Sequence, residues 1–471
     1  MAALHDELAR WMQSRAGQLL ELHRRLVQVP SVNAGDGGPA GEDEVARVAG
    51  SFLTEAGIAW RLGEGSPGRA NLLAAIGAAE PAGRTLLLMG HADVVPPGDL
   101  SGWRFPPFSA HVAEGRVWGR GANDCKMLVA AELFALAALQ AAGAVRGACV
   151  RLAIGADEEA GGRWGFGWLA EHEPDFLRAD LAINEGGGAF IGVSNDGAPM
   201  FTVACGEKGR YEVVFEAVGP GTHASVPWGR PNPLLRIAAF AERLAARTAR
   251  PRRGAPIFEE LPGQLGLKGA DEISAFEETI QRAGAISPAL RNSLLAQSRM
   301  TLVPTMITSG DKSNAVPTRA ELRCDARILP LQSEAELRQE IEAALADFPD
   351  LKFRLEPTAA PSVSAWDAER RQLFERAIAR TLDDDDPKPR PPGWTGAPPC
   401  VLPTWCAGFT DSRFVRALGT PVYGFQLVHP SADPDRLAIH CVDESIDVGM
   451  LLPCARALGH LALEFFEAAG S

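Results

Sequence analysis

Side chains that commonly bind metal ions come after three short apolar runs of this chain. The runs cover residues 85–90, 150–155 and 180–184, and the side chains that follow them are His91, Glu158, Glu159 and Glu185. Short apolar runs that end in Gly or Asn are typical of buried strands in a parallel sheet. Ligands of open α/β sheets bind beyond the carboxyl ends of the strands. We therefore expect an imidazole and several carboxylates at one sheet edge, which predicts a metal site and favours a hydrolase.

The motif G-H-A-D-V-V-P places His91 and Asp93 close together. A metal-bound imidazole usually donates its second N–H to a carboxylate, which fixes the tautomer. The spacing allows Asp93 to accept this hydrogen bond. A strand-end histidine beside an unrelated surface acid has the same sequence, so the motif alone leaves both interpretations open.

Asp124 lies in G-R-G-A-N-D-C-K, directly before an apolar stretch that is expected to form a helix. A carboxylate at this place can bridge two cations, and it can equally cap the helix. The glycines allow the backbone to approach an ion closely. They do not indicate a nucleotide-binding loop, because the third glycine of G-x-G-x-x-G is missing.

Glu158 and Glu159 are adjacent acids, which on most surfaces are simply a solvated pair. At the end of a buried strand, two neighbouring carboxylates can divide the work. One of them binds a cation, while the other stays free of it and serves as general base. Glu185 precedes Gly186–Gly188, a run that allows tight backbone geometry, although it also fits an acid in an ordinary loop.

Two further histidines have chemistry-bearing neighbours. His440 lies in A-I-H-C-V-D-E, where a lone histidine is more often a core residue with a backbone partner. His223 lies in G-T-H-A-S-V-P, in a region that reaches the metal site only by closing over it. A serine nucleophile is not favoured, because the sequence has no G-x-S-x-G elbow.

The charge balance argues against a general nucleic-acid binder, since 46 Lys and Arg residues face 59 Asp and Glu residues, for a formal net charge of −13. The chain of 471 residues is long enough for two or three domains, and its hydrophobic content of 46% supports sizeable cores. The 8 cysteines form no C-x-x-C pair, which favours a reducing cytoplasm. Residues 127–145 are apolar but contain Glu132 and Gln140, so we expect a buried helix and no membrane association.

Residues 1 to about 200 alternate strand-like and helix-like segments, which predicts an α/β layer structure. The pattern then changes to that of a split β-α-β-β-α-β module. Its recognisable elements are a strand over 211–218, a helix from Pro233, a strand over 320–328, a helix from Ser333 and a strand over 353–356. After it we expect, in order, a helix, a long loop over 383–403, a strand over 420–428 and a closing helix over 448–466.

The motifs G-H-A-D-V-V-P, G-R-G-A-N-D-C-K, D-E-E-A-G-G and N-E-G-G, in this order, resemble those of the co-catalytic zinc metallopeptidase superfamily. That group includes aminoacylases, glutamate carboxypeptidase, acetylornithine deacetylase and succinyl-diaminopimelate desuccinylase. Further matches are H-A-S-V-P, D-K-S-N-A-V-P, T-D-S-R and H-C-V-D-E. The resemblance implies an α/β fold with a mixed sheet of zinc-peptidase type flanked by helices, and an inserted α+β, ferredoxin-like lid and dimerisation domain. The implied boundaries are 1–205 and 356–471 for the catalytic domain and 206–355 for the insert.

The same resemblance implies a set of metal ligands. Asp124 would bridge two zinc ions. His91 and Glu185 would complete one of the two sites, and Glu159 and His440 would complete the other. A cis peptide bond would follow Asp124, between it and the next residue, Cys125.

The resemblance implies catalytic and substrate-binding roles as well. Glu158 would be the general acid/base, and Asp93 would orient the metal-bound imidazole. In the insert, His223 would contact the carbonyl oxygen, and Asn314 and Arg327 would bind the substrate. The strict alternation along residues 320–328 places Arg327 on the wet face of its strand, where a guanidinium can bind a substrate carboxylate.

These expectations combine into a two-zinc hydrolase of a dipeptide or N-acyl amino acid, in which Glu158 takes a proton from water shared by the metal ions. Mixed nitrogen and oxygen ligands also accept Co²⁺ or Mn²⁺. A small-molecule or dipeptide substrate, a homodimer formed through the insert, and a cytoplasmic location complete the prediction. The segment A-G-F-T-D-S-R departs from the pattern of the family at Phe409, which bears on substrate choice. The alternatives are a two-metal phosphoesterase and a non-catalytic relative that binds a ligand in the same cleft.

Overall fold

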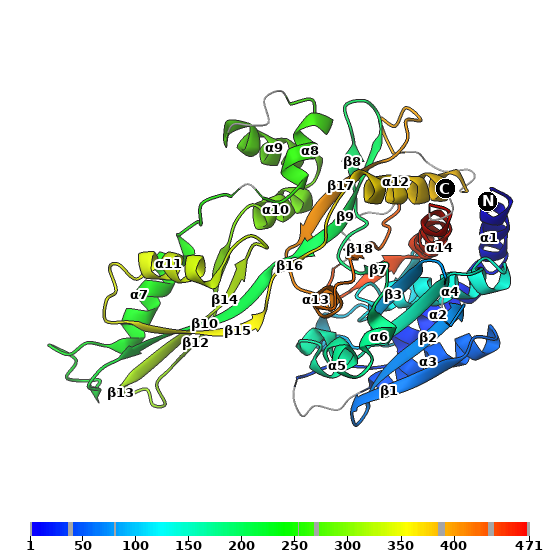
Figure 1. Ribbon diagram of the computed structural model, residues 1–471. Coiled ribbons are helices and arrows are strands. Elements are labelled where there is room, and N and C mark those ends of the chain that lie inside the picture. Colours follow the sequence, from blue (N-terminus) through cyan, green and yellow to red (C-terminus); the bar gives the residue numbers. More distant parts are fainter. Residues whose placement is uncertain are drawn as a thin grey trace.

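The computed structural model describes residues 2–35, 41–79, 82–252, 254–267, 273–384, 391–431 and 438–468. Its main element is a ten-stranded sheet in the order β1-β2-β6-β3-β7-β18-β9-β16, in which β8 and β17 also pair with β9 (Figure 1). The strands are β1 (Trp60–Ser66), β2 (Arg69–Gly77), β3 (Thr85–His91), β6 (Cys149–Gly155), β7 (Leu181–Asn184), β8 (Phe190–Val193), β9 (Pro199–Glu207), β16 (Ser362–Val363), β17 (Cys400–Cys406) and β18 (Val422–Gly424). Strands β6, β3, β7 and β18 run parallel, whereas β2 is antiparallel to β6 and β16 to β9. The predicted mixed α/β sheet is confirmed.

Both faces of the central strands are buried, which explains their uninterrupted apolar sequences. In β3, Leu86 and Leu88 belong to the large hydrophobic cluster on one face of the sheet, and Leu87 and Met89 belong to a smaller cluster on the other face. Side chains alternate between the two faces along a strand, so only a continuous apolar run fills both clusters. The helices of the large cluster include α2 (Ala16–Gln28), α3 (Glu42–Glu55), α4 (Lys126–Ala141), α12 (Ala368–Asp383) and α14 (Leu451–Glu467), and those of the smaller one are α5 (Trp168–His172), α6 (Pro174–Leu177) and α13 (Ser412–Ala417).

The closing helix predicted over 448–466 is confirmed as a short 3-10 turn followed by α14. Among the described residues, Val448–Glu467 is the one stretch with the length and the mean hydropathy, 1.2, of a membrane span. The apolar window of this stretch is 83% buried inside the protein. Because α14 packs against α4 and α12, its apolar sequence is that of a core helix.

A second sheet of four strands, in the order β12-β14-β10-β15, has a hydrophobic cluster of its own (Figure 1). Its strands are β10 (Gly209–Val218), β12 (Thr301–Ser309), β14 (Arg319–Ile328) and β15 (Lys352–Ala359), and its helices are α7 (Pro233–Ala245) and α11 (Glu334–Ala344). This arrangement has the predicted order β-α-β-β-α-β. Ser333 and Glu336 form the predicted capping box at the start of α11. We call this second sheet, its two helices and the short strand pair that its loops form, β11 (Thr222–His223) with β13 (Ala315–Val316), the insert.

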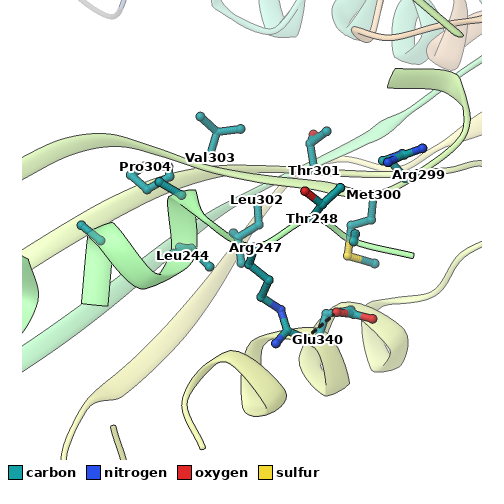
Figure 2. Close-up of a pocket in the computed structure, with 13 residues that line it drawn as sticks. Leu244, Arg247, Thr248, Arg299, Met300, Thr301, Leu302, Val303, Pro304 and Glu340 are labelled. Carbon is teal, nitrogen blue, oxygen red and sulfur yellow. Dashed lines mark hydrogen bonds and ion pairs between the residues drawn. The ribbon is translucent and has the colours of Figure 1, made fainter. Parts of the chain in front are cut away.

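Three helices between α7 and β12 pack against the large sheet instead of the insert. They are α8 (Ile257–Gln264), α9 (Ile273–Ile286) and α10 (Pro288–Gln297), and they contribute side chains to the large hydrophobic cluster. A pocket of about 420 Å³ lies in the insert, between α7, β12 and α11. Figure 2 shows residues that line it. Arg247 and Glu340 form an ion pair of 3.0 Å at this pocket, and none of the candidate metal ligands lines it.

Two segments differ from the expectation. The strand expected over 420–428 is confined to β18, because the chain beyond it follows the glycine loop after β7, where Gln426 N–H donates to the backbone oxygen of Gly187. The loop expected over 383–403 is wrong at its end, since β17 begins at Cys400. The loop was expected because the stretch is rich in acid and proline, but β17 pairs only with β9 in the described part of the chain, and such an edge strand tolerates proline. Residues 385–390 of the expected loop lie outside the described residues.

Candidate metal centre

His91 ends strand β3 and is almost fully buried, with 1% of its surface exposed. Its Nε2 lies 3.0 Å from Asp124 Oδ1 and 3.7 Å from Oε1 of Glu185, the residue that follows β7. Its Nδ1 lies 3.0 Å from the backbone oxygen of Asp93 and 3.4 Å from the Asp93 carboxylate. Asp93 therefore lies behind the imidazole, with its backbone oxygen nearer to Nδ1 than its carboxylate, and leaves Nε2 on the side of the other candidate ligands.

Asp124 lies between two imidazoles. Its Oδ1 is 3.0 Å from His91 Nε2, and its Oδ2 is 3.2 Å from His440 Nε2. The alternative interpretation, a helix cap, does not apply, since Cys125 is the N-cap of α4 and makes no side-chain cap hydrogen bond. The peptide bond between Asp124 and Cys125 is cis. Burial raises the pKa of Asp124, but the hydrogen bonds with His440 and His91 outweigh this and hold that pKa below its ordinary value.

His440 lies on a loop and reaches two carboxylates. Its Nε2 is 3.2 Å from Glu159 Oε1, in addition to the contact with Asp124. Hydrogen bonds with Asp124 and Glu159 raise the pKa of His440 to about 10. His440 and its neighbours Ala438 and Asp443 all have positive φ, at 61°, 47° and 60°, a conformation that non-glycine residues seldom adopt. Such backbone strain is common where a side chain must be held at a functional site.

Asp93 also positions the acidic segment after β6. Its carboxylate accepts the backbone N–H of Glu158 and of Glu159, each at 3.0 Å. A side-chain amide, Asn33 Nδ2, donates to the same carboxylate at 2.8 Å. One buried aspartate thus fixes the first imidazole and both neighbouring glutamates.

The residue before the two glutamates is anchored separately. Asp157 has a positive φ of 67° and pairs with the buried Arg69 at 3.0 Å. Asn33 Nδ2 donates to Asp157 Oδ1 at 3.1 Å. Sequence reasoning missed Asn33 and Arg69, because both precede the recognisable motifs. The only signal for Asp157 was its place as the first acid of D-E-E.

The carboxylates of the centre crowd one another in a buried place. Burial, and then repulsion from Asp124, raises the pKa of Glu185 to about 7. Burial and the charge of Glu185 raise the pKa of Glu158 well above its ordinary value, and burial also raises the pKa of Glu159. A cluster of acids with this cost of ionisation fits bound cations, which would neutralise the charges.

The ligand atoms fall into two groups that share Asp124. One group contains His91, Asp124 and Glu185 together with Cys125, and the other contains Asp124, Glu159 and His440, with the ligand atoms of each group within 4.8 Å of one another. Burial raises the pKa of the Cys125 thiol, which disfavours the thiolate that a metal ion requires. The groups without Cys125 match the predicted ligand sets. The donor chemistry therefore fits two divalent ions.

The three insert residues occupy two separate places. His223, on β11 (Thr222–His223), lies beside Asn314, since the two-residue strand pairs with β13 (Ala315–Val316) and Ala224 N–H donates to Asn314 O at 2.9 Å. Figure 1 shows β13 at the end of the insert furthest from the large sheet. Within one chain, the structure therefore does not bring His223 or Asn314 to the metal centre.

Arg327 lies at the other end of the insert sheet, next to the catalytic part of the chain. Its Nε donates to Asp325 at 2.6 Å, and its guanidinium carbon lies 5.3 Å from the centre of the Phe409 ring. Arg413 packs on the same ring at 4.5 Å, and it donates to the backbone oxygen of Gly161 at 2.6 Å. Phe409, where the sequence departs from the family pattern, is thus held between two cationic side chains.

Comparison with known proteins places the chain in a family. The sequence model of peptidase family M20/M25/M40 matches residues 87–464, and the chain belongs to this family. Succinyl-diaminopimelate desuccinylase of Beijerinckia indica subsp. indica is 27% identical over 441 residues, which cover 91% of this chain and 94% of that protein. An M20 family metallo-carboxypeptidase from Sulfolobus solfataricus has a TM-score of 0.69 at 20% identity, with 96% of this chain and 99% of that chain covered. A dinuclear metal-binding M20 peptidase from Bacillus subtilis has a TM-score of 0.54 at 14% identity, with 97% and 99% covered.

The solved structures establish the likeness of the fold, and the family assignment establishes the class of reaction. Members of this family are metal-dependent hydrolases of amide and peptide bonds, and this chain is a hydrolase of that class. The candidate metal site at the edge of the large sheet is consistent with this assignment.

Proposed function

We propose that the chain is a two-zinc hydrolase that cleaves the amide or peptide bond of a dipeptide or an N-acyl amino acid. The observation that carries the proposal is the position of Asp124, whose oxygens lie 3.0 Å and 3.2 Å from the imidazoles of His91 and His440. Imidazole nitrogens and carboxylate oxygens suit zinc, and they also accept Co²⁺ or Mn²⁺. The names of the similar proteins, a desuccinylase, a metallo-carboxypeptidase and a dinuclear metal-binding peptidase, support the same chemistry.

Glu158 is the residue that we propose moves the proton. When bound, the ions would polarise the scissile carbonyl and lower the pKa of a water molecule. Glu158 belongs to neither group of ligand atoms, and its backbone N–H is fixed by Asp93 at 3.0 Å. Burial raises the pKa of its carboxyl group, which favours accepting a proton from water and delivering it to the leaving amine.

The variant Glu158→Ala tests this role. We expect it to keep its metal content and to lose roughly 10²–10⁴-fold in kcat, the usual contribution of general acid–base catalysis. The neighbouring Glu159→Ala is the matched control, and it should lose one of the two ions. Hydrolysis of dipeptides and N-acyl amino acids, with metal content measured on the same samples, decides the outcome. Normal turnover by Glu158→Ala, or activity on aryl phosphates alone, would contradict the proposal.

We also propose a homodimer formed through the insert. Strand β12 is an edge strand of the insert sheet, and Val303 and Met306 on it are exposed. Strand β13 directly follows Asn314 and pairs with His223 on β11, and it lies at the end of the insert furthest from the large sheet (Figure 1). A second copy of the chain would therefore offer these two residues a metal centre to contact. In that arrangement His223 would contact the oxyanion, and Arg327 beside Phe409 would bind a substrate carboxylate.

A charge on the edge strand tests the dimer. Met306→Lys places a cation where a second strand would pair, and charged edges oppose strand pairing. We expect this variant to sediment as a monomer, while Leu331→Lys, at an exposed apolar residue in a loop, should leave the dimer intact. A wild-type chain that sediments as a monomer at every concentration would contradict the proposal. The cytoplasmic location remains a proposal that rests on the widely spaced cysteines.

A further inference from the structure

Glu444 is a fully buried acid that contacts the segment carrying Asp124. Its Oε1 accepts two consecutive backbone N–H groups, that of Asn123 at 3.0 Å and that of Asp124 at 3.2 Å. Its surface exposure is 0%. A buried carboxylate is costly unless donors surround it, so these two amides are held where the carboxylate needs them.

The other oxygen of Glu444 pairs with a buried arginine. Arg120 Nη1 donates to Glu444 Oε2 at 2.6 Å, and the guanidinium packs over the Trp103 ring at 5.4 Å from its centre. The backbone adds to the same link, since Gly119 N–H donates to Glu444 O at 2.9 Å. The next residue, Ser445, begins strand β19 (Ser445–Asp447), which pairs with β5 (Arg116–Trp118) from Ser445 opposite Trp118 onward.

These contacts join the two chain segments that carry two candidate ligands of one ion. Asp124 is part of the segment that Glu444 holds by its amides, and His440 lies four positions before Glu444 on the strained loop. Asp124 Oδ2 and His440 Nε2 are 3.2 Å apart. Their separation depends on the register of two segments that are distant in the sequence, and Glu444 fixes this register.

We propose that Glu444 is a positioning residue that aligns Asp124 and His440 for the ion they share. The inference rests on the proposed metal centre and adds a residue that does not touch the ion. The group of His91, Asp124 and Glu185 depends less on Glu444, because His91 and Glu185 stand at the ends of two strands that pair in the large sheet. Loss of Glu444 therefore weakens the binding of the ion shared by Asp124 and His440 more than the binding of the other ion.

The test is a zinc titration of the full-length metal-free chain carrying Glu444→Gln. The introduced amide keeps one oxygen for the two backbone N–H groups but presents an N–H group to Arg120, so the register of the segments changes. We expect the first ion to bind as in the wild type and the second ion to bind about 10–100-fold more weakly, the usual effect of removing an outer partner of a metal ligand. The Co²⁺ absorption spectrum, followed ion by ion, gives a readout that is independent of turnover.

Two further variants make the result decisive. Glu464→Gln removes another buried acid that pairs with an arginine, Arg376 at 2.7 Å, and we expect it to leave both ions unaffected. Glu444→Asp keeps the charge but has a shorter side chain, and we expect it to weaken binding of the second ion to an intermediate extent. It provides the test if Glu444→Gln does not fold.

The outcomes separate this inference from the proposed function. Two ions bound by folded Glu444→Gln and Glu444→Asp with wild-type affinity would overturn the positioning role, while the metal centre itself would stand. An equal loss in Glu464→Gln would overturn it as well, because the effect would then reflect general destabilisation. A wild-type chain that binds no divalent ion would overturn both the inference and the proposed function.

Discussion

The two halves of the candidate metal centre are built in different ways. The His91 half stands on the ends of β3 and β7 and is buried, with 1% of His91 exposed. The His440 half stands on a loop, where 49% of the His440 side chain is exposed. Hydrogen-bonded strands fix His91 and Glu185 in the first half, whereas contacts between segments that are distant in the sequence fix His440 in the second. We infer that the sheet preorganises one ion site and that the other site needs the complete tertiary structure.

The backbone supports the same distinction. His91 lies in a regular strand, while His440 has a positive φ of 61° and lies between two other residues with positive φ. Positions of this kind cost of order 1–3 kcal/mol each and persist only where the surroundings impose them. The ion of the His440 half should therefore bind more weakly and exchange faster than the ion of the His91 half.

The matched pair His91→Ala and His440→Ala should show the largest difference. His91→Ala removes a ligand from the preorganised half, and we expect metal affinity to fall by more than about 100-fold, the upper range for loss of a mere outer partner. His440→Ala should retain one tightly bound ion. Metal analysis after dialysis, together with isothermal titration using zinc, measures both effects.

Circular dichroism of both variants serves as the control for folding. Equal loss of both ions in the two variants would show that the halves are not independent. Retention of two ions by His91→Ala would contradict the assignment of the buried half as a metal site. The difference between the two variants should be the same with Co²⁺ as with zinc, since both ions accept the same ligands.

A smaller effect is expected behind the buried half, at Glu132 of α4. Burial raises the pKa of Glu132 well above its ordinary value, and its carboxylate lies close to Gly90, the residue before His91. The folded chain therefore holds a proton that the unfolded chain releases above about pH 4.5, so folding stability falls as the pH rises from there toward the folded pKa. Glu132→Gln removes this loss. Its free energy of unfolding relative to the wild type should therefore increase as the pH rises, by at most about 1.4 kcal/mol per pH unit.

Urea denaturation of the metal-free proteins between pH 5 and pH 8 measures this advantage. The control is Glu340→Gln on the surface of the insert, where loss of the ion pair with Arg247 should change stability by no more than about 1 kcal/mol at any pH. A stability difference between Glu132→Gln and the wild type that does not change with pH would contradict the expectation. Such a result would mean that Glu132 can ionise beside the His91 half without a loss of stability.

Strong local patterns were predictable from the sequence. The strands β3, β6 and β7 and the capping box at Ser333 follow from apolar periodicity and from hydrogen-bonding side chains that act within a few residues. Strand β17 was missed because its stretch is rich in acid and proline, and proline argues against a strand unless it is known to lie at an edge. Edge position depends on which strands neighbour it, and local sequence does not specify that.

The sequence by itself determined the donor atoms of the candidate site, since residue types and strand ends placed His91, Glu159 and Glu185 at one sheet edge, and the motif resemblance added Asp124 and His440. Only the tertiary structure decided how His440 meets Asp124 at 3.2 Å and which residues hold them there. Asn33, Arg69 and Glu444 act through hydrogen bonds to segments far away in the chain. The physical reason is that a buried polar group requires a hydrogen-bond partner, and the local sequence does not specify which distant residue will be that partner.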